Sequence, residues 1–356
     1  MGASVPFFMP ATRVDIASFL QLAKEYPVLD VRSPGEFHHA HIPGAISFPL
    51  FSDEERKIVG TTYKQNSREE AIKVGLDFFG PTMKDRIIAA EKIANGNKTL
   101  LVHCWRGGMR SGAIAWLLDL YGFKVYTLAG GYKAYRNWVL SLFKKDFPIS
   151  IIGGYTGSGK TELLQGLEKG GESVIDLETI ASHKGSAFGS IGMPVQPGQE
   201  QFENNLATKL ADVESSRGNL HVLWMEDESQ RIGLVNIPGD LWSRMRQSRV
   251  YFFDIPFEKR LEHIVEEYGV LDRQKMMDSI DRITKKLGHL QAQNAKNFLA
   301  EGNTKACFEI LLRYYDKLYE KSLHNREGLK DLLVRVHAKE TGANNKDLLL
   351  NMMKNK

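Results

Sequence analysis

The segment TLLVHCWRGGMRS, residues 99–111, is typical of a buried strand that ends in a glycine-rich loop and leads into a helix. Residues 100–102 form the apolar run expected of a core strand. A strand–loop–helix unit of this kind points backbone N–H groups at one spot, which favours bound anions and ionised thiols. Cys104 occupies that spot, with Arg106 and Arg110 beside it. We therefore interpret Cys104 as a nucleophile assisted by two arginines; a buried structural cysteine is the alternative.

Length and composition indicate a soluble protein of two domains. The chain has 356 residues, of which 42% are hydrophobic and 25% charged. Its only cysteines are Cys104 and Cys307, so it has no disulfide framework, and Cys307 lies in a helical pattern typical of a structural role. Residues 1–10 lack the layout of a signal peptide, and no apolar run has membrane-spanning length. We expect a cytoplasmic protein with no membrane partner.

The positive charge of the chain is concentrated towards its C-terminus. The net charge is +4, but residues 241–356 hold 22 Lys and Arg against 16 Asp and Glu. Such a surplus suits a polyanionic partner, although lysine-rich helices are also common as solvated faces. Two basic clusters are the candidates for contact with a polyanion: Arg244, Arg246 and Arg249, and then Arg282, Lys285 and Lys286.

Further motifs surround the cysteine loop. LDVRSPGEF (29–37), AHIPGAISFP (40–49) and GFKVYTLAGGYKAYRNW (122–138) flank it, and together they resemble a rhodanese domain over about residues 12–140. The resemblance implies an α/β domain in which Cys104 carries a persulfide-type intermediate and Asp30 and Arg32 support the loop. Three histidines lie close together, His38, His39 and His41. No cysteine or carboxylate pair is spaced to complete a metal site with them, so we expect no metal there.

The spacing within the cysteine loop departs from that of small rhodaneses. Arg110 stands six residues after Cys104, which is the spacing of the rhodanese-like phosphatases. A wider loop of this kind suits a tetrahedral anion such as phosphate or selenophosphate. Residues 53–75 form an additional segment that is either a solvated insertion or a basic binding surface formed by Arg56, Lys57, Lys64 and Arg68.

A second phosphate-binding motif lies in ISIIGGYTGSGKTELLQGL, residues 149–167. An apolar strand precedes the motif and a helical pattern follows it, as in a P-loop. Backbone N–H groups of the loop would hold a β-phosphate, Lys160 would reach terminal phosphates, and Thr161 would hold Mg²⁺. The phosphate-binding residues predicted here are Gly154, Gly157, Ser158, Gly159, Lys160 and Thr161.

Another apolar strand, in LHVLWMEDES (220–229), ends in acidic residues. Glu226, Asp227 and Glu228 there resemble a Walker B motif, in which a carboxylate binds Mg²⁺ directly or through water. We therefore add Glu226 and Asp227 to the predicted phosphate site. Mg²⁺ is a candidate there, whereas no dedicated protein metal centre is predicted. Whether ATP binds is left open.

Segments after the P-loop make the resemblance specific. Together with CWRGGMRS, they resemble the tRNA 2-selenouridine synthases over about residues 10–320. The segments are VIDLETIASHKGSAFGSIG (174–192), PGQEQFENNL (197–206), MEDESQRIG (225–233) and LLRYYDKLYE (311–320). We place four of their residues near the phosphate site: His183, Lys184, Ser186 and Arg231.

The resemblance implies a function for both sites. The family replaces the sulfur of wobble 2-thiouridine in tRNA by selenium from selenophosphate, and it attaches a geranyl group from geranyl diphosphate to that sulfur. The P-loop would then hold the diphosphate, the cysteine loop would bind selenophosphate or carry selenium, and the basic clusters would bind tRNA. Selenophosphate synthetase is a candidate partner. The alternatives are a rhodanese-like phosphatase or sulfurtransferase with a nucleotide-binding domain, and a non-catalytic ATP-dependent RNA-binding module.

The expected fold is α/β throughout. We expect a rhodanese-like domain at residues 1–140, a P-loop NTPase-like core at 141–256 and a mostly helical part at 257–356. At the start of the chain, residues 11–25 are typical of a helix and residues 26–32 of a strand.

Overall fold

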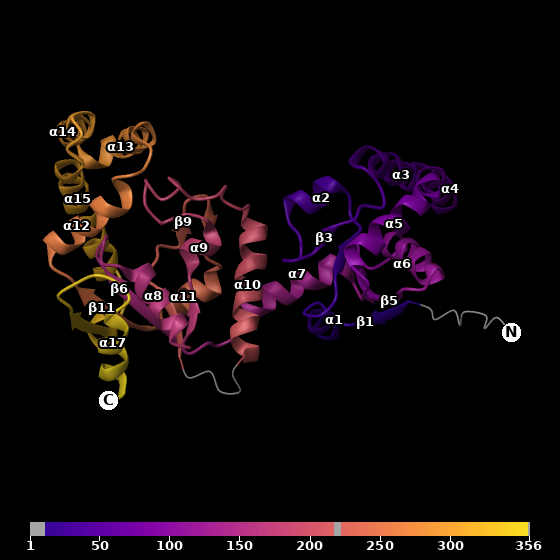
Figure 1. Cartoon of the computed structure of the whole chain (residues 1–356), viewed down its shortest axis with the longest axis horizontal. Coiled ribbons are helices and arrows are strands. Elements are labelled where there is room, and N and C mark those ends of the chain that lie inside the picture. Colours follow the sequence, from indigo (N-terminus) through magenta and orange to yellow (C-terminus); the bar gives the residue numbers. More distant parts are fainter. Residues whose placement is uncertain (1–10, 217–221, 355–356) are drawn as a thin grey trace. The chain divides into compact units, whose positions relative to one another are not determined.

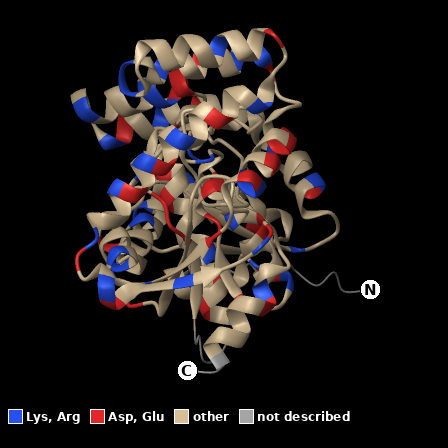
Figure 2. Cartoon of the chain, turned by 90° about the vertical axis from the view of Figure 1, so that its left-hand side faces the viewer, with Lys and Arg blue, Asp and Glu red and all other residues tan. Residues whose placement is uncertain are grey.

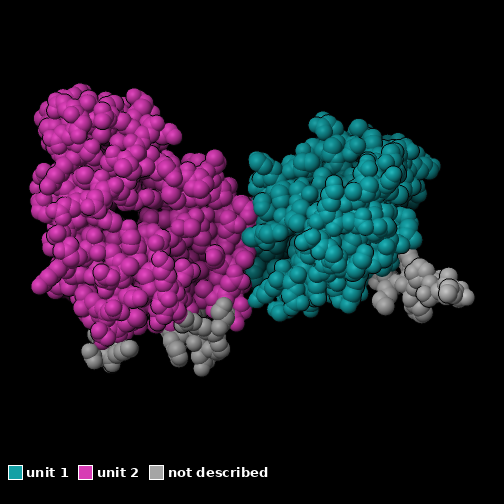
Figure 3. All heavy atoms as spheres, viewed as in Figure 1, with its two compact units in different colours: residues 1–141 teal, residues 142–356 magenta. Residues whose placement is uncertain are grey.

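The chain forms two compact units, residues 1–141 and residues 142–356 (Figure 3). The structure is a computed structural model that describes residues 11–216 and 222–354. Two predictions fall partly or wholly outside the described residues. The predicted absence of a signal peptide concerns residues 1–10, and the predicted strand at 220–229 begins with Leu220 and His221, which are not described. We call the two units the cysteine-loop unit and the P-loop unit.

The cysteine-loop unit is built on a five-stranded parallel sheet with the order β1-β5-β4-β2-β3. Its strands are β1 (Thr12–Val14), β2 (Val28–Asp30), β3 (Ile46–Ser47), β4 (Thr99–His103) and β5 (Lys124–Leu128). The central strand β4 is almost fully buried, as its apolar run predicted. Parallel strands place their carboxyl ends at one edge of a sheet, so the loop after β4 lies between the ends of β2 and β5.

Helices of the cysteine-loop unit connect these strands (Figure 1). They are α1 (Ile16–Leu22), α2 (Pro34–His39), α3 (Asp53–Gln65), α4 (Arg68–Phe79), the 3-10 turn η1 (Gly80–Thr82), α5 (Met83–Ala94), α6 (Met109–Tyr121) and α7 (Gly131–Leu142). The helix predicted at 11–25 is shorter than expected, because residues 12–14 pair with β5 as strand β1. Asp15 then caps α1 by accepting a hydrogen bond from the Ser18 N–H, which explains why the helix begins there.

The segment at residues 53–75, treated above as an insertion, forms most of the helix pair α3 and α4, which pack on each other. Ser52 begins α3 with a capping box that includes Glu55, and Ser67 caps α4. The inner faces of this pair pack on the same apolar core as Cys104. The segment is therefore part of the folded unit and not a solvated appendage.

The P-loop unit has its own five-stranded parallel sheet, with the order β12-β11-β6-β8-β7. Its strands are β6 (Ile149–Gly154), β7 (Ser173–Ile175), β8 (Leu223–Glu226), β11 (Arg249–Asp254) and β12 (Leu333–His337). A short antiparallel pair consists of β9 (Arg231–Ile232) and β10 (Val235–Asn236). The P-loop follows the central strand β6, and the predicted acidic residues follow its neighbour β8.

Helices of the P-loop unit surround its sheet and form a helical end where α13, α14 and α15 lie together (Figure 1). The helices are α8 (Lys160–Lys169), α9 (Leu177–Ala181), α10 (Gln199–Ser216), α11 (Gly239–Gln247), α12 (Phe257–Tyr268), α13 (Arg273–Leu287), α14 (His289–Ala300), α15 (Thr304–His324), α16 (Leu329–Leu332) and α17 (Asn345–Lys354). The helical end has a separate apolar core, which includes Ile280, Phe308 and Cys307.

The C-terminal part is mostly helical, as expected, but it also contains the strand β12. This strand pairs in parallel with β11, so residues 333–337 complete the sheet that carries the P-loop. The sequence analysis missed it because the segment is short and lies between helical patterns. Among the described residues, no helix is both long and apolar enough to cross a bilayer.

Candidate functional sites

The cysteine loop, residues 104–108, connects β4 to α6 in a conformation that only glycine permits. Gly107 has a φ of 63°, and a Cβ there would lie 2.4 Å from the Leu128 carbonyl oxygen. Gly131 approaches the loop as closely, since its Cβ would lie 2.3 Å from the Cys104 carbonyl oxygen. The Tyr132 N–H donates to that same oxygen at 2.8 Å. The two turns therefore hold each other at a backbone separation that larger residues would prevent.

The Cys104 sulfur is surrounded by hydrogen-bond donors. The Gly108 N–H donates to Sγ at 3.4 Å, and the Ser111 hydroxyl lies 3.3 Å from Sγ. Burial disfavours the thiolate, but the Ser111 hydroxyl and the backbone N–H groups of Gly108, Ser111 and Arg106 outweigh it, so the pKa of Cys104 is lowered. The expected readiness to ionise is thus present. Hydrogen bonds to the sulfur are the main cause of the lowered pKa, whereas the sequence suggests that the arginine charges contribute as well.

Arg110 is paired with a carboxylate from another element. Its Nη1 lies 2.6 Å from Oε2 of Glu36 on α2, and Arg56 on α3 lies 3.1 Å from the same oxygen. Burial raises the pKa of Glu36, but Arg110, the Ser33 N–H and Arg56 lower it to about 2, so Glu36 is ionised. An anion bound by Arg110 must therefore compete with Glu36. Arg106 has an exposed position in the loop.

A buried ion pair lies below the cysteine loop. Arg32 and Asp30 are both almost fully buried and lie 2.6 Å apart. The Arg32 guanidinium stacks on the Tyr132 ring at 3.8 Å, and Tyr132 binds the Cys104 carbonyl through its backbone. His103 is fully buried beside Asp30, and burial lowers its pKa to about 4, so it is neutral. This arrangement agrees with the supporting role expected for Asp30 and Arg32.

The P-loop has the backbone geometry that phosphate binding requires. Gly157 and Gly159 have φ values of 79° and 72°, in the left-handed region. A Cβ on Gly154 would lie 2.5 Å from the Ser158 hydroxyl, which is buried and has no partner. Lys160 begins α8, and its ammonium group donates to the Gly154 carbonyl at 3.0 Å. The six residues predicted to bind phosphate thus share one loop and the first turn of α8.

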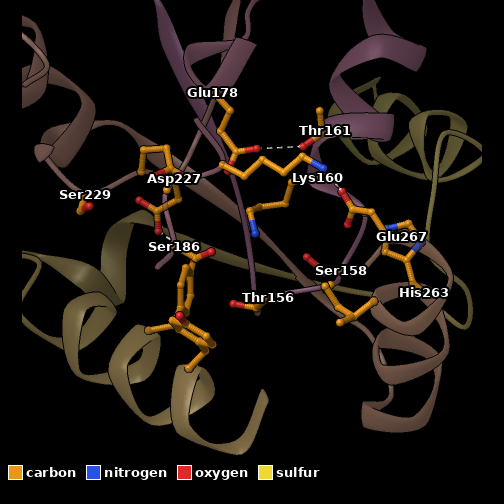
Figure 4. Close-up of a pocket in the computed structure, with 18 of the residues that line it drawn as sticks. Thr156, Ser158, Lys160, Thr161, Glu178, Ser186, Asp227, Ser229, His263 and Glu267 are labelled. Atoms are coloured by element: carbon orange, nitrogen blue, oxygen red, sulfur yellow. Dashed lines mark hydrogen bonds and ion pairs between the residues drawn. The ribbon is translucent and has the colours of Figure 1, made fainter. Parts of the chain in front are cut away.

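A cavity of about 370 Å³ opens beside the P-loop (Figure 4). The P-loop and the first turn of α8 line one side, and residues from α12 and α15 line others. Figure 4 shows Lys160, Thr161 and Glu178 grouped within it, with His263 and Glu267 at another wall. Polar loops and aromatic side chains both contribute, including Tyr268, Tyr315 and Tyr319. The cavity therefore offers both a phosphate-binding end and apolar surface.

Three carboxylates meet beside Lys160. Glu178, Glu226 and Glu228 each have a carboxylate oxygen within 4.8 Å of the other two. Glu226 ends β8, Glu178 lies in the first turn of α9 after β7, and these strands are neighbours. Burial raises the pKa values of all three; the charge of Glu178 adds to this for Glu226 and Glu228, and Lys160 offsets part of it for Glu178 and Glu228.

The carboxylate group fits a divalent cation. One oxygen of Glu226, Oε2, is buried without a hydrogen-bond partner, and Thr161 donates to Glu178 at 3.3 Å. Hard cations such as Mg²⁺ prefer carboxylate and hydroxyl oxygens. The sequence predicts Glu226 in this site and shows Glu228 in the same acidic run, but it gives no sign of Glu178. Glu228 adjoins the recognised acidic pair, whereas Glu178 lies 48 residues before Glu226 and only the sheet brings it there.

Asp227 also lines the cavity, and both of its carboxylate oxygens are engaged by other side chains. Arg326 lies 2.6 Å from Oδ1, and the Tyr319 hydroxyl donates to Oδ2 at 2.7 Å. The same Tyr319 hydroxyl accepts a hydrogen bond from the Gly154 N–H at 3.1 Å. Asp227 thus links α15 and the segment after it to the first residue of the P-loop.

Of the four other residues predicted near this site, two line the cavity and two do not. Lys184 and Ser186 line the cavity, and Lys184 forms an ion pair with Glu267. His183 packs against Gly189 and Gly233 instead, and Arg231 is exposed and donates to the Gly233 carbonyl at 2.9 Å. The structure therefore brings two of the four to the cavity wall.

The candidate tRNA residues lie on separate elements. Arg244 and Arg246 on α11 donate to backbone carbonyls of Phe143, Lys144 and Ser322, and Arg249 begins β11. Arg282 on α13 donates to the Ala187 carbonyl at 3.1 Å, whereas Lys285 and Lys286 are exposed in the last turn of that helix. Figure 2, in which the left-hand side of Figure 1 faces the viewer, shows basic residues interspersed with acidic ones over the P-loop unit.

Comparison with known proteins assigns both units. A rhodanese-like domain model matches residues 15–137, and a model described as the tRNA 2-selenouridine synthase AAA domain matches residues 147–343. A tRNA 2-selenouridine synthase from Bdellovibrio bacteriovorus is 34% identical, over 84% of this chain and 89% of the relative. The chain belongs to the tRNA 2-selenouridine synthase family. A second member, from Nitrosomonas europaea, is 33% identical over 89% of this chain and 94% of its own length.

Membership of this family accounts for the order of the two units along the chain. Among solved structures, a rhodanese-related protein from Thermoplasma volcanium is 21% identical over 35% of this chain and 91% of its own, with a TM-score of 0.23. The rhodanese-like unit and the P-loop unit predicted from sequence are both confirmed, as is the α/β fold class.

Proposed function

We propose that this protein replaces the sulfur of wobble 2-thiouridine in tRNA by selenium, with selenophosphate as donor and an S-geranylated base as intermediate. One observation carries the proposal: the chain has two strand–loop–helix sites whose side chains differ in chemistry. The Cys104 loop offers a thiol of lowered pKa, and the P-loop offers Lys160 beside three carboxylates. Membership of the family supports a tRNA substrate, and we propose that the reaction takes place in the cytoplasm.

The first step is assigned to the P-loop unit. The sulfur of 2-thiouridine attacks C1 of geranyl diphosphate, a C–S bond forms, the C–O bond breaks, diphosphate leaves, and N3 of the base loses its proton. Backbone N–H groups of the P-loop and the Lys160 ammonium stabilise the leaving diphosphate. Glu178, Glu226 and Glu228 would hold Mg²⁺, which would offset the same charge. ATP has no part in this scheme.

The second step is assigned to the cysteine-loop unit. Selenium from selenophosphate attacks C2 of the base, the C–Se bond forms, and the C–S bond breaks. Geranylthiol leaves with one proton, the Cys104 thiolate takes the phosphoryl group from selenium, and water hydrolyses the resulting S–P bond to phosphate as N3 of the base regains its proton. The alkylation must come first because the sulfur of a thioether leaves more readily than the sulfur of the unmodified thiocarbonyl. The loop around Cys104 holds the tetrahedral donor with its backbone N–H groups.

The alternative functions leave more unexplained. A rhodanese-like phosphatase would use Arg110 to clamp a phosphoester, but this guanidinium is already bound to Glu36 at 2.6 Å. A phosphatase or a sulfurtransferase also gives no reason for a second, P-loop site in the same chain. A non-catalytic RNA-binding module gives no role to a cysteine whose pKa is lowered.

Recognition of tRNA is assigned to the basic residues of the P-loop unit. Lys285 and Lys286 are the best placed, since they are exposed on α13, while Arg244, Arg246 and Arg282 also hold backbone carbonyls. Contacts to phosphates position RNA and make its affinity depend on salt. Direct transfer of selenophosphate from selenophosphate synthetase is part of the proposal.

The experiment that tests the proposal is nucleoside mass spectrometry of thiolated tRNA after incubation with the protein. With geranyl diphosphate alone, the S-geranyl nucleoside should accumulate. With selenophosphate added, 2-selenouridine should replace it. A failure to form either nucleoside, under conditions where the protein is folded, would refute the function proposed here.

A further inference from the structure

The cysteine-loop unit contains a cavity of its own, of about 160 Å³, formed by α3, α4 and the start of α6. We call it the α3–α4 pocket. Figure 1 shows α3 and α4 side by side, and the two helices pack on each other. The lining is almost entirely hydrocarbon, from residues such as Phe51, Val59, Leu76 and Phe79. Arg110 is the charged side chain among the lining residues.

The α3–α4 pocket is continuous with the cysteine loop. Met109 and Arg110, the first two residues of α6, line it, and they follow the loop directly. Phe51 and Phe79 belong to the same buried apolar cluster as Cys104. A chain held in the pocket would therefore end beside the loop that contains the thiol.

The mouth of the pocket exposes large apolar side chains. Tyr63, Leu76 and Met109 are 50%, 54% and 52% exposed, and all three line the pocket. Scattered exposed apolar residues are ordinary, but a group of them around a cavity is typical of a binding site for apolar matter. Here the exposed group surrounds one opening and reaches the cysteine loop.

The chemistry of the lining selects the kind of ligand. Phosphate, sugar and base edges need several hydrogen-bond partners, and the side chains of this pocket offer few besides Arg110, which is bound to Glu36. Dry cavities of about 150 Å³ lined by Leu, Ile and Phe bind hydrocarbons. A pocket of this size, open at one end, suits a branched chain of several carbons whose polar end stays outside.

We propose that the α3–α4 pocket binds the hydrocarbon chain on the sulfur of the alkylated base while the cysteine loop exchanges sulfur for selenium. The inference rests on the proposed function, because only the S-geranylated intermediate carries such a chain. The pocket then distinguishes this intermediate from unmodified 2-thiouridine, which has nothing to bury there. It also holds the leaving geranylthiol next to the reacting loop.

The test compares Leu76→Glu, at the mouth of the pocket, with Leu120→Glu, on α6 and 57% exposed outside it. The full chain is given selenophosphate and tRNA that carries either S-geranyl- or S-methyl-2-thiouridine. We expect Leu76→Glu to raise KM for the geranylated tRNA at least tenfold, with little change for the methylated tRNA. Leu120→Glu should match the unmodified protein on both. The ratio of kcat/KM for the two tRNAs is measured within one preparation, so partial unfolding cancels.

The outcomes separate this inference from the function on which it rests. If the unmodified protein converts geranylated tRNA and Leu76→Glu leaves the geranyl-to-methyl ratio unchanged, the pocket proposal is wrong and the function stands. If Leu76→Glu impairs both tRNAs equally, the surface contacts the tRNA body or a partner protein, and the pocket proposal is again overturned. If the unmodified protein converts neither tRNA, the proposed function itself fails.

Discussion

Replacement of Lys160 by alanine should separate the two proposed steps. In the structure the Lys160 ammonium donates to the Gly154 carbonyl at 3.0 Å, from the first turn of α8 at the cavity wall. A hydrogen bond to a charged group contributes about 1.5–3 kcal/mol. At about 1.4 kcal/mol for each factor of ten, geranylation should fall about 10- to 100-fold. The matched control is Lys169→Ala, an exposed lysine in the last turn of the same helix, which should leave the rate unchanged.

The assay must separate the loss of Lys160 from an effect on the neighbouring carboxylates. Burial raises the pKa values of Glu178 and Glu228, and Lys160 partly offsets this, so both carboxylates hold their protons more strongly in the variant. Geranylation is therefore measured at saturating Mg²⁺ by nucleoside mass spectrometry. Selenation should fail in the same reaction, for lack of the geranylated base.

Supplying tRNA that already carries S-geranyl-2-thiouridine should then restore selenation by the Lys160→Ala variant, because the cysteine-loop unit is unchanged. If the variant geranylates tRNA at the normal rate, Lys160 does not stabilise the leaving diphosphate. If pre-geranylated tRNA is not converted, the P-loop also serves the selenium step, and the assignment of one step to each unit is refuted.

Three further predictions follow from other contacts. Cys104→Ser should abolish selenium incorporation and leave geranylation intact; normal 2-selenouridine from this variant would exclude the thiol from the reaction. Without Mg²⁺, Glu226 and Glu228 bind protons more strongly in the folded protein than in the unfolded chain, which stabilises the fold at low pH. This stabilisation is lost as the pH rises through their raised pKa values, so the melting temperature should fall with rising pH. Glu228→Gln should flatten that fall and weaken stabilisation by added Mg²⁺, and an unchanged pH profile would contradict the carboxylate site. Charge reversal at Lys285 and Lys286, which are exposed on α13, should weaken tRNA binding and make the slope of log affinity against log salt shallower by about 1 to 2. An unchanged slope would leave these two lysines as a solvated face.

Much of each site was predictable because its geometry is local. The glycines of the P-loop and of the cysteine loop are needed where the backbone adopts a positive φ, and the functional residues are their immediate neighbours. An apolar strand before such a loop and a helix after it are also visible as periodicity. The sequence by itself therefore determined the two units, Cys104 and Lys160. It also predicts that the backbone N–H groups of both loops bind an anion.

The tertiary structure alone decided which distant side chains meet these loops. Glu178 joins Glu226 because β7 and β8 are neighbours in a parallel sheet, and Tyr319 reaches Gly154 across 165 residues. Arg110 is held by Glu36, 74 residues away, so its charge could not be assigned from the loop alone. The inner faces of α3 and α4 form a pocket, although their sequence showed mainly charge. No local pattern records such pairings, because strand order and helix packing are set by burial of the whole core.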